Sequence, residues 1–243
     1  GGHGRVDRFF GAEPGRAAGG MRDIDTEKEE RILTFIESMA SGNTEFLNAL
    51  EKEALGEGVP IIRTQTQSLL RFLLELVKPE KILEVGTATG FSACLMLNYA
   101  PQGAAVTTIE RDPERIAKAR EHFAMIDEDP SRMPGRRSGQ IALLEGDAAS
   151  VLKELKGPYD FVFMDAAKGQ YIHFLPEVVR VLTPGGLLVS DNIFKDGEIL
   201  ESRFAVKRRD RTIHKRMREY LQALTERADL QTLLLEEGDG AAL

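Results

Sequence analysis

From Lys81 onward the sequence alternates short apolar runs with stretches of helical periodicity, and this alternation constrains the fold more than any other feature. The apolar runs are KILEV, AVTTIE, IALLEG, DFVFMD and GLLVSD. Helices are predicted between them near residues 91–99, 113–125, 148–155 and 171–182. Strands that alternate with helices are typical of parallel strands joined by crossovers. The pattern therefore predicts an α/β protein with a Rossmann-like, doubly wound sheet.

The segments on either side of this core complete the predicted architecture. Apolar residues recur at helical spacing from about Asp25, again between Phe46 and Leu55, and again from Thr66 to Val77. We expect residues 21–79 to form N-terminal helices that pack on a core of residues 80–243. A helix near 211–227 precedes two last strands, QTLLLEE and GAAL, which the turn GDG joins. The prediction is one domain, residues 21–243, with a seven-stranded, mostly parallel sheet and a C-terminal antiparallel hairpin.

The N-terminal segment, the length of the apolar runs and the cysteine count bear on where the protein is located in the cell. Residues 1–20 are rich in Gly, Ala and Arg and precede Met21, so we expect a disordered leader or a non-native remnant. No apolar run approaches the roughly 18 residues of a membrane span, and none is expected. Cys94 is the only cysteine, which excludes an intrachain disulfide. A cytoplasmic location is the expectation.

Charge is segregated along the chain. The formal net charge is −7, which on average opposes binding to nucleic acid. Residues 203–218 nevertheless contain eight Lys or Arg and one Asp, a local net charge of +7, so the remainder carries −14. A solvated helix face is one explanation and a surface for polyanions is the other. Further arginines, Arg132, Arg136 and Arg137, lie in a long predicted loop near residues 127–140, where they would extend the basic surface or be mobile.

A glycine-containing turn follows the first strand. In GTATG, Gly86 and Gly90 allow a tight turn and a close approach of ligand to backbone. Ala88 occupies the place of the second glycine in a dinucleotide fingerprint, which argues against NAD. A structural turn and a ligand-binding loop both remain open from these residues alone.

Two carboxylates at later strand ends favour the ligand-binding loop. Glu110 closes the second strand, where an ionised carboxylate can accept hydrogen bonds from both hydroxyls of a ribose. Asp147 follows the third strand, where an adenine edge would then lie. Capping or turn carboxylates are the alternative for each residue taken alone.

Several motifs together resemble a known family. ILEVGTATGFSA, TIERDPERIAKAREHF, GDAASVL, YDFVFMDAAKGQY, LLVSDNIF and GDGAAL are similar to motifs of class I S-adenosylmethionine-dependent O-methyltransferases, in the divalent-metal-dependent group of catechol and caffeoyl-CoA methyltransferases. The resemblance extends from about residue 59 to the end. It implies that the cofactor is S-adenosylmethionine and that the protein is a homodimer. It also implies these cofactor-binding residues: Ile62, Glu84, Gly86, Ser92, Glu110, Asp147, Ala148 and Asp165.

Oxygen-bearing side chains end the fourth and fifth predicted strands. These are Asp165, Asp191 and Asn192, and neighbouring parallel strands would bring them into one crevice. Carboxylate and amide oxygens without His or Cys select a hard cation, which predicts Mg²⁺, with Mn²⁺ or Ca²⁺ as alternatives. An Asp-Asn turn after a strand is the competing explanation. The resemblance implies that the three residues are metal ligands.

A metal at this place suits methyl transfer to oxygen. A neutral hydroxyl is a poor nucleophile, and a bound cation lowers its pKa and fixes its position. Asp165 and Lys168 are the predicted catalytic residues. The resemblance implies that Lys168 is a general base or an electrostatic partner for the departing proton, and a solvated lysine is the alternative.

The basic segment bears on the acceptor. KRRDRTIHKRMREYL resembles the bacterial branch of the family that methylates 5-hydroxyuridine at the wobble position of tRNA, giving 5-methoxyuridine. In 5-hydroxyuracil the 5-hydroxyl and the 4-carbonyl oxygen are adjacent and can chelate a cation as a catechol does. Phosphates of an anticodon stem-loop would then meet basic side chains, namely Lys207, Arg208, Arg209, Arg211, Lys215 and Arg216. A small-molecule catechol O-methyltransferase and a non-catalytic nucleotide- or RNA-binding protein are the alternative functions.

Overall fold

A single mixed sheet forms the centre of the computed structural model, which describes residues 19–194, 197–202, 206–236 and 238–243. Its strand order is β3-β2-β1-β4-β5-β7-β6. The strands are β1 (Lys81–Val85), β2 (Ala105–Glu110), β3 (Ile141–Glu145), β4 (Tyr159–Met164), β5 (Leu182–Ser190), β6 (Leu234–Leu235) and β7 (Ala241–Ala242). The first five are parallel, whereas β7 runs antiparallel to β5 and β6 antiparallel to β7. The predicted fold class and closing hairpin are confirmed.

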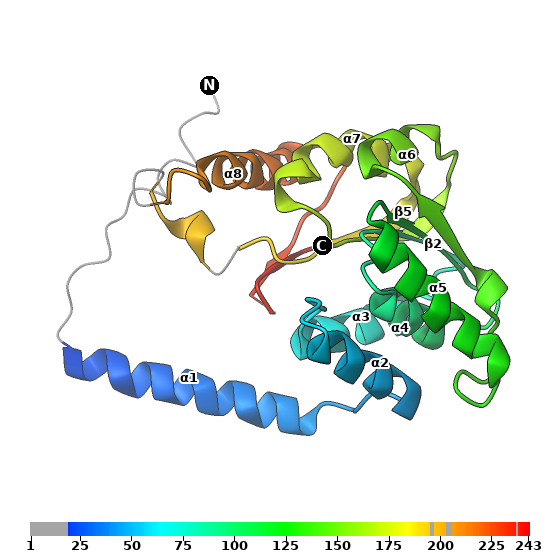
Figure 1. Ribbon diagram of the computed structural model, residues 1–243. Coiled ribbons are helices and arrows are strands. Elements are labelled where there is room, and N and C mark those ends of the chain that lie inside the picture. Colours follow the sequence, from blue (N-terminus) through cyan, green and yellow to red (C-terminus); the bar gives the residue numbers. More distant parts are fainter. Residues whose placement is uncertain (1–18, 195–196, 203–205, 237) are drawn as a thin grey trace.

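Helices cover both faces of the sheet (Figure 1). On one face lie α2 (Glu45–Gly56), α3 (Thr64–Val77), α4 (Phe91–Tyr99) and α5 (Pro113–Glu128), and on the other lie α6 (Ala148–Glu154), α7 (Tyr171–Val181) and α8 (Arg211–Glu226). Successive side chains of a strand point to opposite faces. In β4, Phe161 and Phe163 pack toward the first layer, and Val162 and Met164 toward the second. Because both faces are covered, apolar residues on the central strands point to both faces.

The strand boundaries differ from the sequence prediction at the end of the sheet. β5 begins at Leu182 rather than Gly186, because Leu182 already pairs with Tyr159 before the register shifts at a bulge. The intervening Thr-Pro-Gly-Gly is typical of a turn, which hid this first pairing from sequence analysis. The last two strands are only two residues long each.

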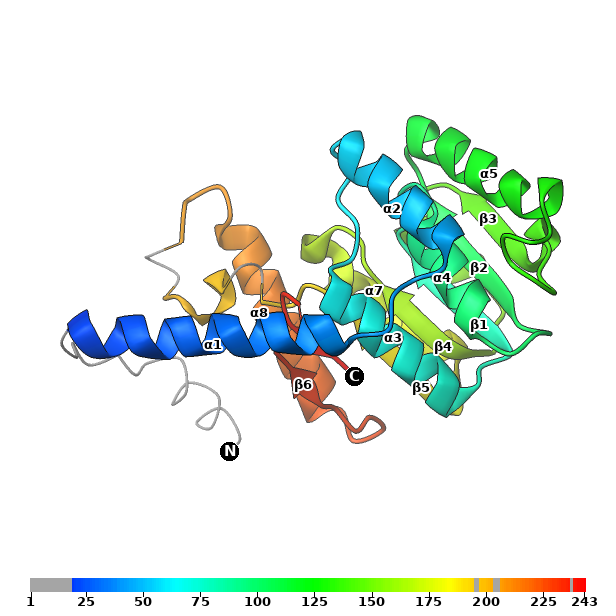
Figure 2. The same ribbon diagram turned by 90° about the horizontal axis from the view of Figure 1, so that it is seen from below.

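The first helix, α1 (Gly19–Met39), departs from the expectation that the early helices pack on the core. It leads away from the rest of the protein (Figures 1 and 2), and its side chains from residue 27 to 39 are exposed. The expectation was correct for α2 and α3, which bury Leu47, Leu50, Leu70 and Leu74, and wrong for α1. Among the described residues no helix is long and apolar enough to cross a membrane.

The segment after α5 corrects the prediction for Arg136. Rather than extending a basic surface, this side chain is only 7% exposed, and it donates hydrogen bonds to the carbonyl oxygens of Asn98, Ala100 and Pro101. The last carbonyls of a helix have no partner within the helix, and here the guanidinium group supplies one for the end of α4. Arg132 also turns inward, donating to the carbonyl oxygen of Met125.

Candidate active site

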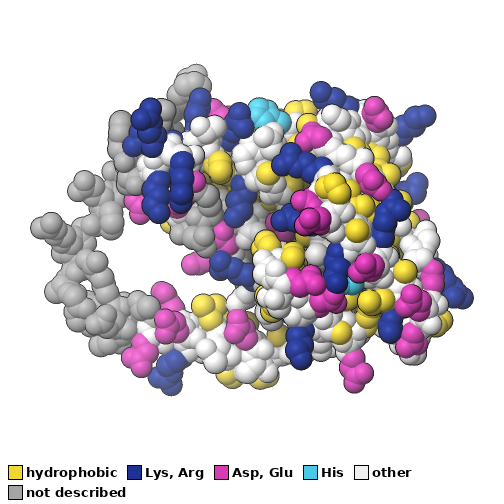
Figure 3. Space-filling view, viewed as in Figure 1, with side chains coloured by type: hydrophobic (Ala, Val, Ile, Leu, Met, Phe, Trp, Pro, Cys, Tyr) yellow, Lys and Arg dark blue, Asp and Glu magenta, His cyan; other side chains and the backbone are white. Residues whose placement is uncertain are grey.

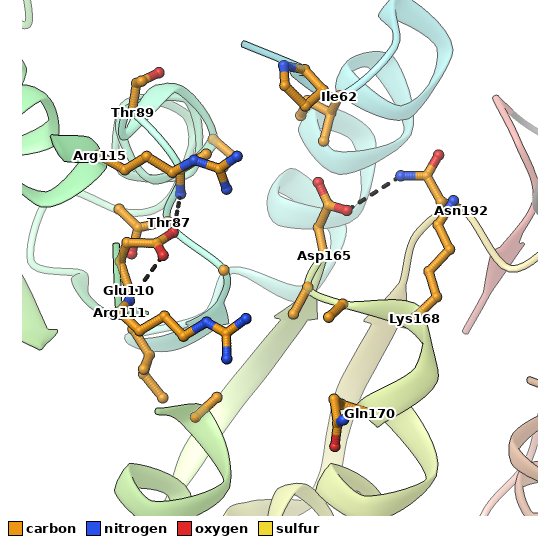
Figure 4. Close-up of a pocket in the computed structure, with 18 of the residues that line it drawn as sticks. Ile62, Thr87, Thr89, Glu110, Arg111, Arg115, Asp165, Lys168, Gln170 and Asn192 are labelled. Atoms are coloured by element: carbon orange, nitrogen blue, oxygen red, sulfur yellow. Dashed lines mark hydrogen bonds between the residues drawn. The ribbon is translucent and has the colours of Figure 1, made fainter. Parts of the chain in front are cut away.

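A cavity of ≈ 580 Å³ opens at the carboxyl ends of the five parallel strands (Figure 4). The sheet order reverses between β1 and β4, and ligands of doubly wound sheets bind at such a switch point. Each parallel strand supplies a predicted residue at or just beyond its end, and these are Gly86, Glu110, Asp147, Asp165 and Asn192. The arrangement follows from parallel pairing, which places all five strand ends at one edge.

The loop after β1 needs both of its glycines. Gly86 has φ +104°, and a Cβ atom there would lie 2.1 Å from the carbonyl oxygen of Asp165. Gly90 has φ +90°, and its Cβ would lie 2.7 Å from the ring of Phe123. Between them Ala88 also adopts a left-handed conformation, with φ +46°. The loop is therefore a strained turn pressed between β4 and α5.

Glu110 is fixed by the backbone around the cavity. Its carboxylate accepts hydrogen bonds from the N–H groups of Ala88 (2.9 Å), Arg111 (2.8 Å) and Asp112 (3.0 Å). The side chain is 8% exposed and lines the cavity. A carboxylate oxygen offers more than one acceptor site, so the predicted contact with ribose hydroxyls stays compatible with these bonds.

Asp147 both caps a helix and lines the cavity, the two alternatives considered from the sequence. It caps α6 by accepting a hydrogen bond from the N–H of Ala149 (3.0 Å), and it also lines the cavity beside Ala148. Its Oδ2 lies 3.6 Å from Nη1 of Arg111. Arg111 and Arg115 also line the cavity, and the sequence analysis did not single them out although both lie directly beyond Glu110 in ERDPER.

Glu84 differs from the other predicted cofactor residues because it does not reach the cavity wall. It is fully buried, and the hydroxyls of Ser92 and Thr108 donate hydrogen bonds to its two carboxyl oxygens. Burial raises the pKa of Glu84 to about 8. Ser92 and Ile62 do line the cavity, so any contribution of Glu84 to a ligand would pass through Ser92.

Hydrogen bonds join the tips of β1, β4 and β5. The N–H of Asp165 donates to the carbonyl oxygen of Val85, and that of Asp191 to the carbonyl oxygen of Met164, both at 3.0 Å. The buried Tyr171 hydroxyl lies 3.1 Å from the carbonyl oxygen of Met164 and 3.2 Å from that of Asp191. Asn192, in a left-handed conformation that asparagine tolerates, donates from Nδ2 to Oδ1 of Asp165 at 3.2 Å (Figure 4).

The charged carboxylates of Asp165 and Asp191 repel each other. Burial raises the pKa of Asp165. Burial and the neighbouring Asp165 charge raise the pKa of Asp191 to about 7. The Asp191 side chain accepts a hydrogen bond from the hydroxyl of Thr66 (3.1 Å) and is 1% exposed. A cation between the carboxylates would relieve this repulsion.

The side chains present fit a hard divalent cation, with one condition. In the described part of the chain, no group of three or more His, Cys, Asp and Glu side chains could hold a metal. A metal here therefore needs the amide oxygen of Asn192 beside Asp165 and Asp191. The oxygen and nitrogen of an amide exchange places by a half-turn, which would present the oxygen to the cation. This all-oxygen donor set suits Mg²⁺.

Lys168 lines the cavity on the side of Asp165 and Asn192 (Figure 4). It begins the short helix η2 (Lys168–Gln170), and its Nζ lies 3.6 Å from Oδ2 of Asp239. Asp239 belongs to the turn between β6 and β7, so the C-terminal hairpin contacts the candidate site. Sequence analysis missed this contact because it depends on the hairpin folding back onto the strand tips.

The six predicted RNA-binding residues fall into two groups. Lys207, Arg208, Arg209 and Lys215 are exposed, and Figure 3 shows Lys and Arg side chains gathered around the N-terminal end of α8. In contrast, Arg211 donates to the carbonyl oxygen of Val206 and Arg216 to that of Gly169, both at 3.2 Å. In the first group, Arg209 and Lys215 form ion pairs with Asp210 and Glu219, whereas the second group is tied to backbone carbonyls.

Comparisons with known proteins agree with this architecture. The chain is 28% identical over 178 residues to the catechol O-methyltransferase of Niastella koreensis, covering 71% of this chain and 76% of that protein. It is 26% identical over 189 residues to the caffeoyl-CoA O-methyltransferase of Stellaria longipes, covering 74% and 75%. The solved structure of an SAH-bound methyltransferase from Podospora anserina superposes with a TM-score of 0.76 at 23% identity, covering 95% of this chain and 97% of that one, which shows the shared fold.

The family itself follows from a match that covers most of the sequence. Residues 37–243 match the family model described as O-methyltransferase. That range contains every strand of the sheet and every residue that lines the cavity. The chain therefore belongs to the O-methyltransferase family.

Proposed function

We propose that this protein transfers a methyl group from S-adenosylmethionine to a hydroxyl oxygen of an acceptor that also offers a second, adjacent oxygen to a divalent cation. The observation that carries the proposal is that one cavity is lined both by carboxylates suited to a nucleoside and by oxygen-bearing side chains suited to a cation. Glu110 lies on one side, and Asp165, Lys168 and Asn192 on the other (Figure 4). Asp147 also lines this cavity. The SAH-bound state of the similar Podospora anserina methyltransferase supports the choice of cofactor.

The cavity suits this cofactor in size and chemistry. Its volume of ≈ 580 Å³ lies within the range of about 300 to 1,000 Å³ for small-molecule sites. Glu110 would accept hydrogen bonds from the ribose hydroxyls, and Asp147 and Ala148 would border the adenine. Gly86, Ser92 and Ile62 would then surround the methionine half, with its sulfonium directed toward Asp165.

In the transfer step, a bond forms between the acceptor oxygen and the methyl carbon while the carbon–sulfur bond breaks. The electron pair of that bond stays on sulfur, which gives S-adenosylhomocysteine, and the hydroxyl proton passes to water. Asp165, Asp191 and Asn192 would hold a divalent cation, which when bound lowers the pKa of the acceptor hydroxyl. The Lys168 ammonium, held in place by Asp239, stabilises negative charge on that oxygen. The strand tips keep both reactants oriented, which supplies much of the rate enhancement between two bound molecules.

For the acceptor, we propose 5-hydroxyuridine in tRNA. The 5-hydroxyl and 4-carbonyl oxygens of this base form the required adjacent pair. The exposed Lys207, Arg208 and Arg209 precede α8, and α8 packs on η2, which carries Lys168. Phosphates near the modified base would contact these side chains, since such contacts supply most of the sequence-independent affinity for nucleic acid.

A small catechol is the second candidate, because the curated relatives named above act on catechol and caffeoyl-CoA by their names. It needs the same cavity and cation but not the basic residues before α8. The two candidates therefore share Asp165 and differ in Lys207, Arg208 and Arg209.

One experiment tests the reaction and separates the acceptors. The purified protein, S-adenosylmethionine and Mg²⁺ are incubated either with tRNA that carries 5-hydroxyuridine or with catechol, and methylated products are measured by mass spectrometry. We expect 5-methoxyuridine to form, EDTA to abolish its formation, and Asp165→Ala to lower the rate by about 100-fold or more. Asp229→Ala, an exposed aspartate paired with Arg227, is the matched control and should retain full activity.

The results decide between the candidates as follows. Methylation of tRNA that falls steeply as salt rises supports phosphate contacts. Methylation of catechol alone establishes the small-molecule enzyme. Binding of S-adenosylhomocysteine without methyl transfer to either acceptor would favour a non-catalytic binding protein and overturn the proposal.

A further inference from the structure

A buried histidine supports the loop after β1 from the side opposite the cavity. His122, on α5, is 1% exposed, and its Nδ1 lies 2.7 Å from the carbonyl oxygen of Thr89. Phe123 on α5 and Gly90 in the loop are also in contact, because the Phe123 ring fills the space where a Cβ of residue 90 would lie. Thus α5 contacts the loop at two consecutive residues.

Thr89 and Glu53 are the two polar neighbours of this histidine, and only the bond to Thr89 has good hydrogen-bond geometry. Its Nε2 lies 3.3 Å from Oε2 of Glu53 on α2, but without hydrogen-bond geometry. Within the described ranges, the buried side-chain atoms that have no hydrogen-bond partner are His122 Nε2 and Thr89 Oγ1. Both belong to the same contact. Because the Thr89 carbonyl can only accept, Nδ1 carries a hydrogen in this bond.

The carbonyl that His122 holds is linked to the wall of the cavity. Beside it, the N–H of Gly90 donates to the carbonyl oxygen of Thr87 (2.9 Å), and the N–H of Ala88 donates to Oε2 of Glu110 (2.9 Å). Ala88 has a positive φ angle, a strained conformation that a residue other than glycine keeps only where the surroundings impose it. A change in the Thr89 carbonyl would therefore also move the donor that orients Glu110.

We infer that His122 is a positioning residue for the cofactor, because its hydrogen bond to Thr89 keeps the loop of residues 86–90 and the carboxylate of Glu110 in the binding arrangement. The inference rests on the proposed function, since it takes S-adenosylmethionine as the ligand of the cavity. His122 touches no reactant. It acts through Thr89, so its effect belongs to cofactor binding rather than to the acceptor.

The test compares two substitutions that fill similar space. His122→Phe keeps a ring but removes the donor, and we expect S-adenosylhomocysteine to bind about tenfold more weakly by calorimetry, the effect of one lost hydrogen bond. The KM for S-adenosylmethionine should rise more than kcat falls, and the amides of Ala88 and Gly90 should exchange hydrogen faster. His122→Asn retains a donor near the position of Nδ1 and should recover most of the affinity.

A matched control separates this role from general packing. His214 on α8 is also buried, at 3% exposure, with its Nε2 3.1 Å from the carbonyl oxygen of Glu201. His214→Phe should lower the thermal unfolding temperature without changing the affinity for S-adenosylhomocysteine. His122→Met, which fits the same space without a donor, replaces the phenylalanine variant if that variant does not fold.

Each outcome has one meaning. If the unmodified protein does not bind S-adenosylhomocysteine, the proposed function itself is wrong. If it binds but His122→Phe binds equally well, the inference about His122 is wrong while the proposed function stands. Weak binding that His122→Asn does not restore would show that the volume of the ring matters and the hydrogen bond does not, which also overturns the inference.

Discussion

Glu84 lowers the stability of the protein at neutral pH, because a fully buried carboxyl group resists ionisation. Its pKa rises from the ordinary 4.5 to about 8 through burial. Below pH 4.5 the group is protonated in both the folded and the unfolded state, and its favourable contribution is complete. As the pH rises toward 8 the unfolded state gains by ionising, so this contribution is lost. At about 1.4 kcal/mol per pKa unit, the loss is on the order of 3 to 5 kcal/mol.

Glu84→Gln should therefore flatten the pH dependence of stability. The amide stays neutral, and the hydroxyls of Ser92 and Thr108 can accept as well as donate hydrogen bonds. We expect the unfolding temperature of the variant to change much less between pH 5 and pH 8 than that of the original protein, as measured by scanning calorimetry. Glu154→Gln, at an exposed position of α6, should leave the original slope unchanged. Equal slopes for all three proteins would contradict the argument.

At the scale of single residues, the sequence predicted those whose position follows from a strand end. Glu110, Asp147, Asp165 and Asn192 were identified because parallel strands bring their carboxyl ends to one edge. Residues such as His122 and Asp239 were missed because their partners, Thr89 and Lys168, are distant in the sequence. The roles of the predicted residues toward cofactor and metal remain predictions.

At the scale of elements, the basic segment has two separable tasks. Arg216 joins α8 to η2 by donating to the carbonyl oxygen of Gly169, next to Lys168. Arg208 is exposed. We expect Arg216→Ala to lower methyl transfer several-fold with tRNA and with catechol alike, because loss of about 1 kcal/mol of support loosens η2. Steady-state rates with both acceptors measure this.

Arg208→Ala should affect the tRNA reaction alone. It removes a phosphate contact, so the KM for tRNA should rise, and the dependence of binding on salt should become less steep by about one unit. Lys153→Ala, a basic residue of α6 on a different part of the surface, is the control and should change neither reaction. A loss of catechol turnover in Arg208→Ala would show that this arginine supports the fold rather than binding RNA.

Sequence patterns could not show which basic residues of this segment are exposed and which support the fold. Charge spacing shows that residues 203–218 are basic, but which guanidinium groups turn inward depends on how α8 packs against η2 and η3 (Glu198–Leu200). The same limit applies to Arg136, whose inward turn depends on the end of α4. Helix and strand types, in contrast, follow from periodicity, because burial on two faces leaves a strong hydrophobic signal.

At the scale of the whole molecule, α1 poses the main question about assembly. Its large apolar side chains are 48 to 71% exposed, and these are Ile32, Leu33, Phe35, Ile36 and Met39. On α3, Phe72 and Leu76 are both 67% exposed. Helices in proteins owe most of their stability to tertiary packing of an apolar face, and monomeric proteins rarely expose apolar patches larger than a few hundred Å². Some surface must therefore cover α1.

We expect a second copy of the chain to cover it. Each copy would present both the arm α1 and the apolar face of α3, and a two-fold arrangement lets both be buried at once. Together these side chains can supply most of the roughly 800 Å² that each partner contributes to a stable interface. Light scattering after size-exclusion chromatography should give twice the mass of the 26.9 kDa chain.

A charge placed on the apolar side of α1 should separate the two copies. Phe35→Glu would bury an unpaired carboxylate in the interface, at a cost large enough to dissociate a dimer at micromolar concentration. Thr34→Glu lies on the opposite side of α1, since Thr34 is two residues from both Ile32 and Ile36 and so points about 160° away from them, and it should leave the mass unchanged. A monomeric unmodified protein, or a dimer that survives Phe35→Glu, would mean that α1 is not the contact between copies. Because the cavity is lined by residues 60–62, α4 and the strand ends but by no residue of α1, the monomeric variant should still bind S-adenosylhomocysteine.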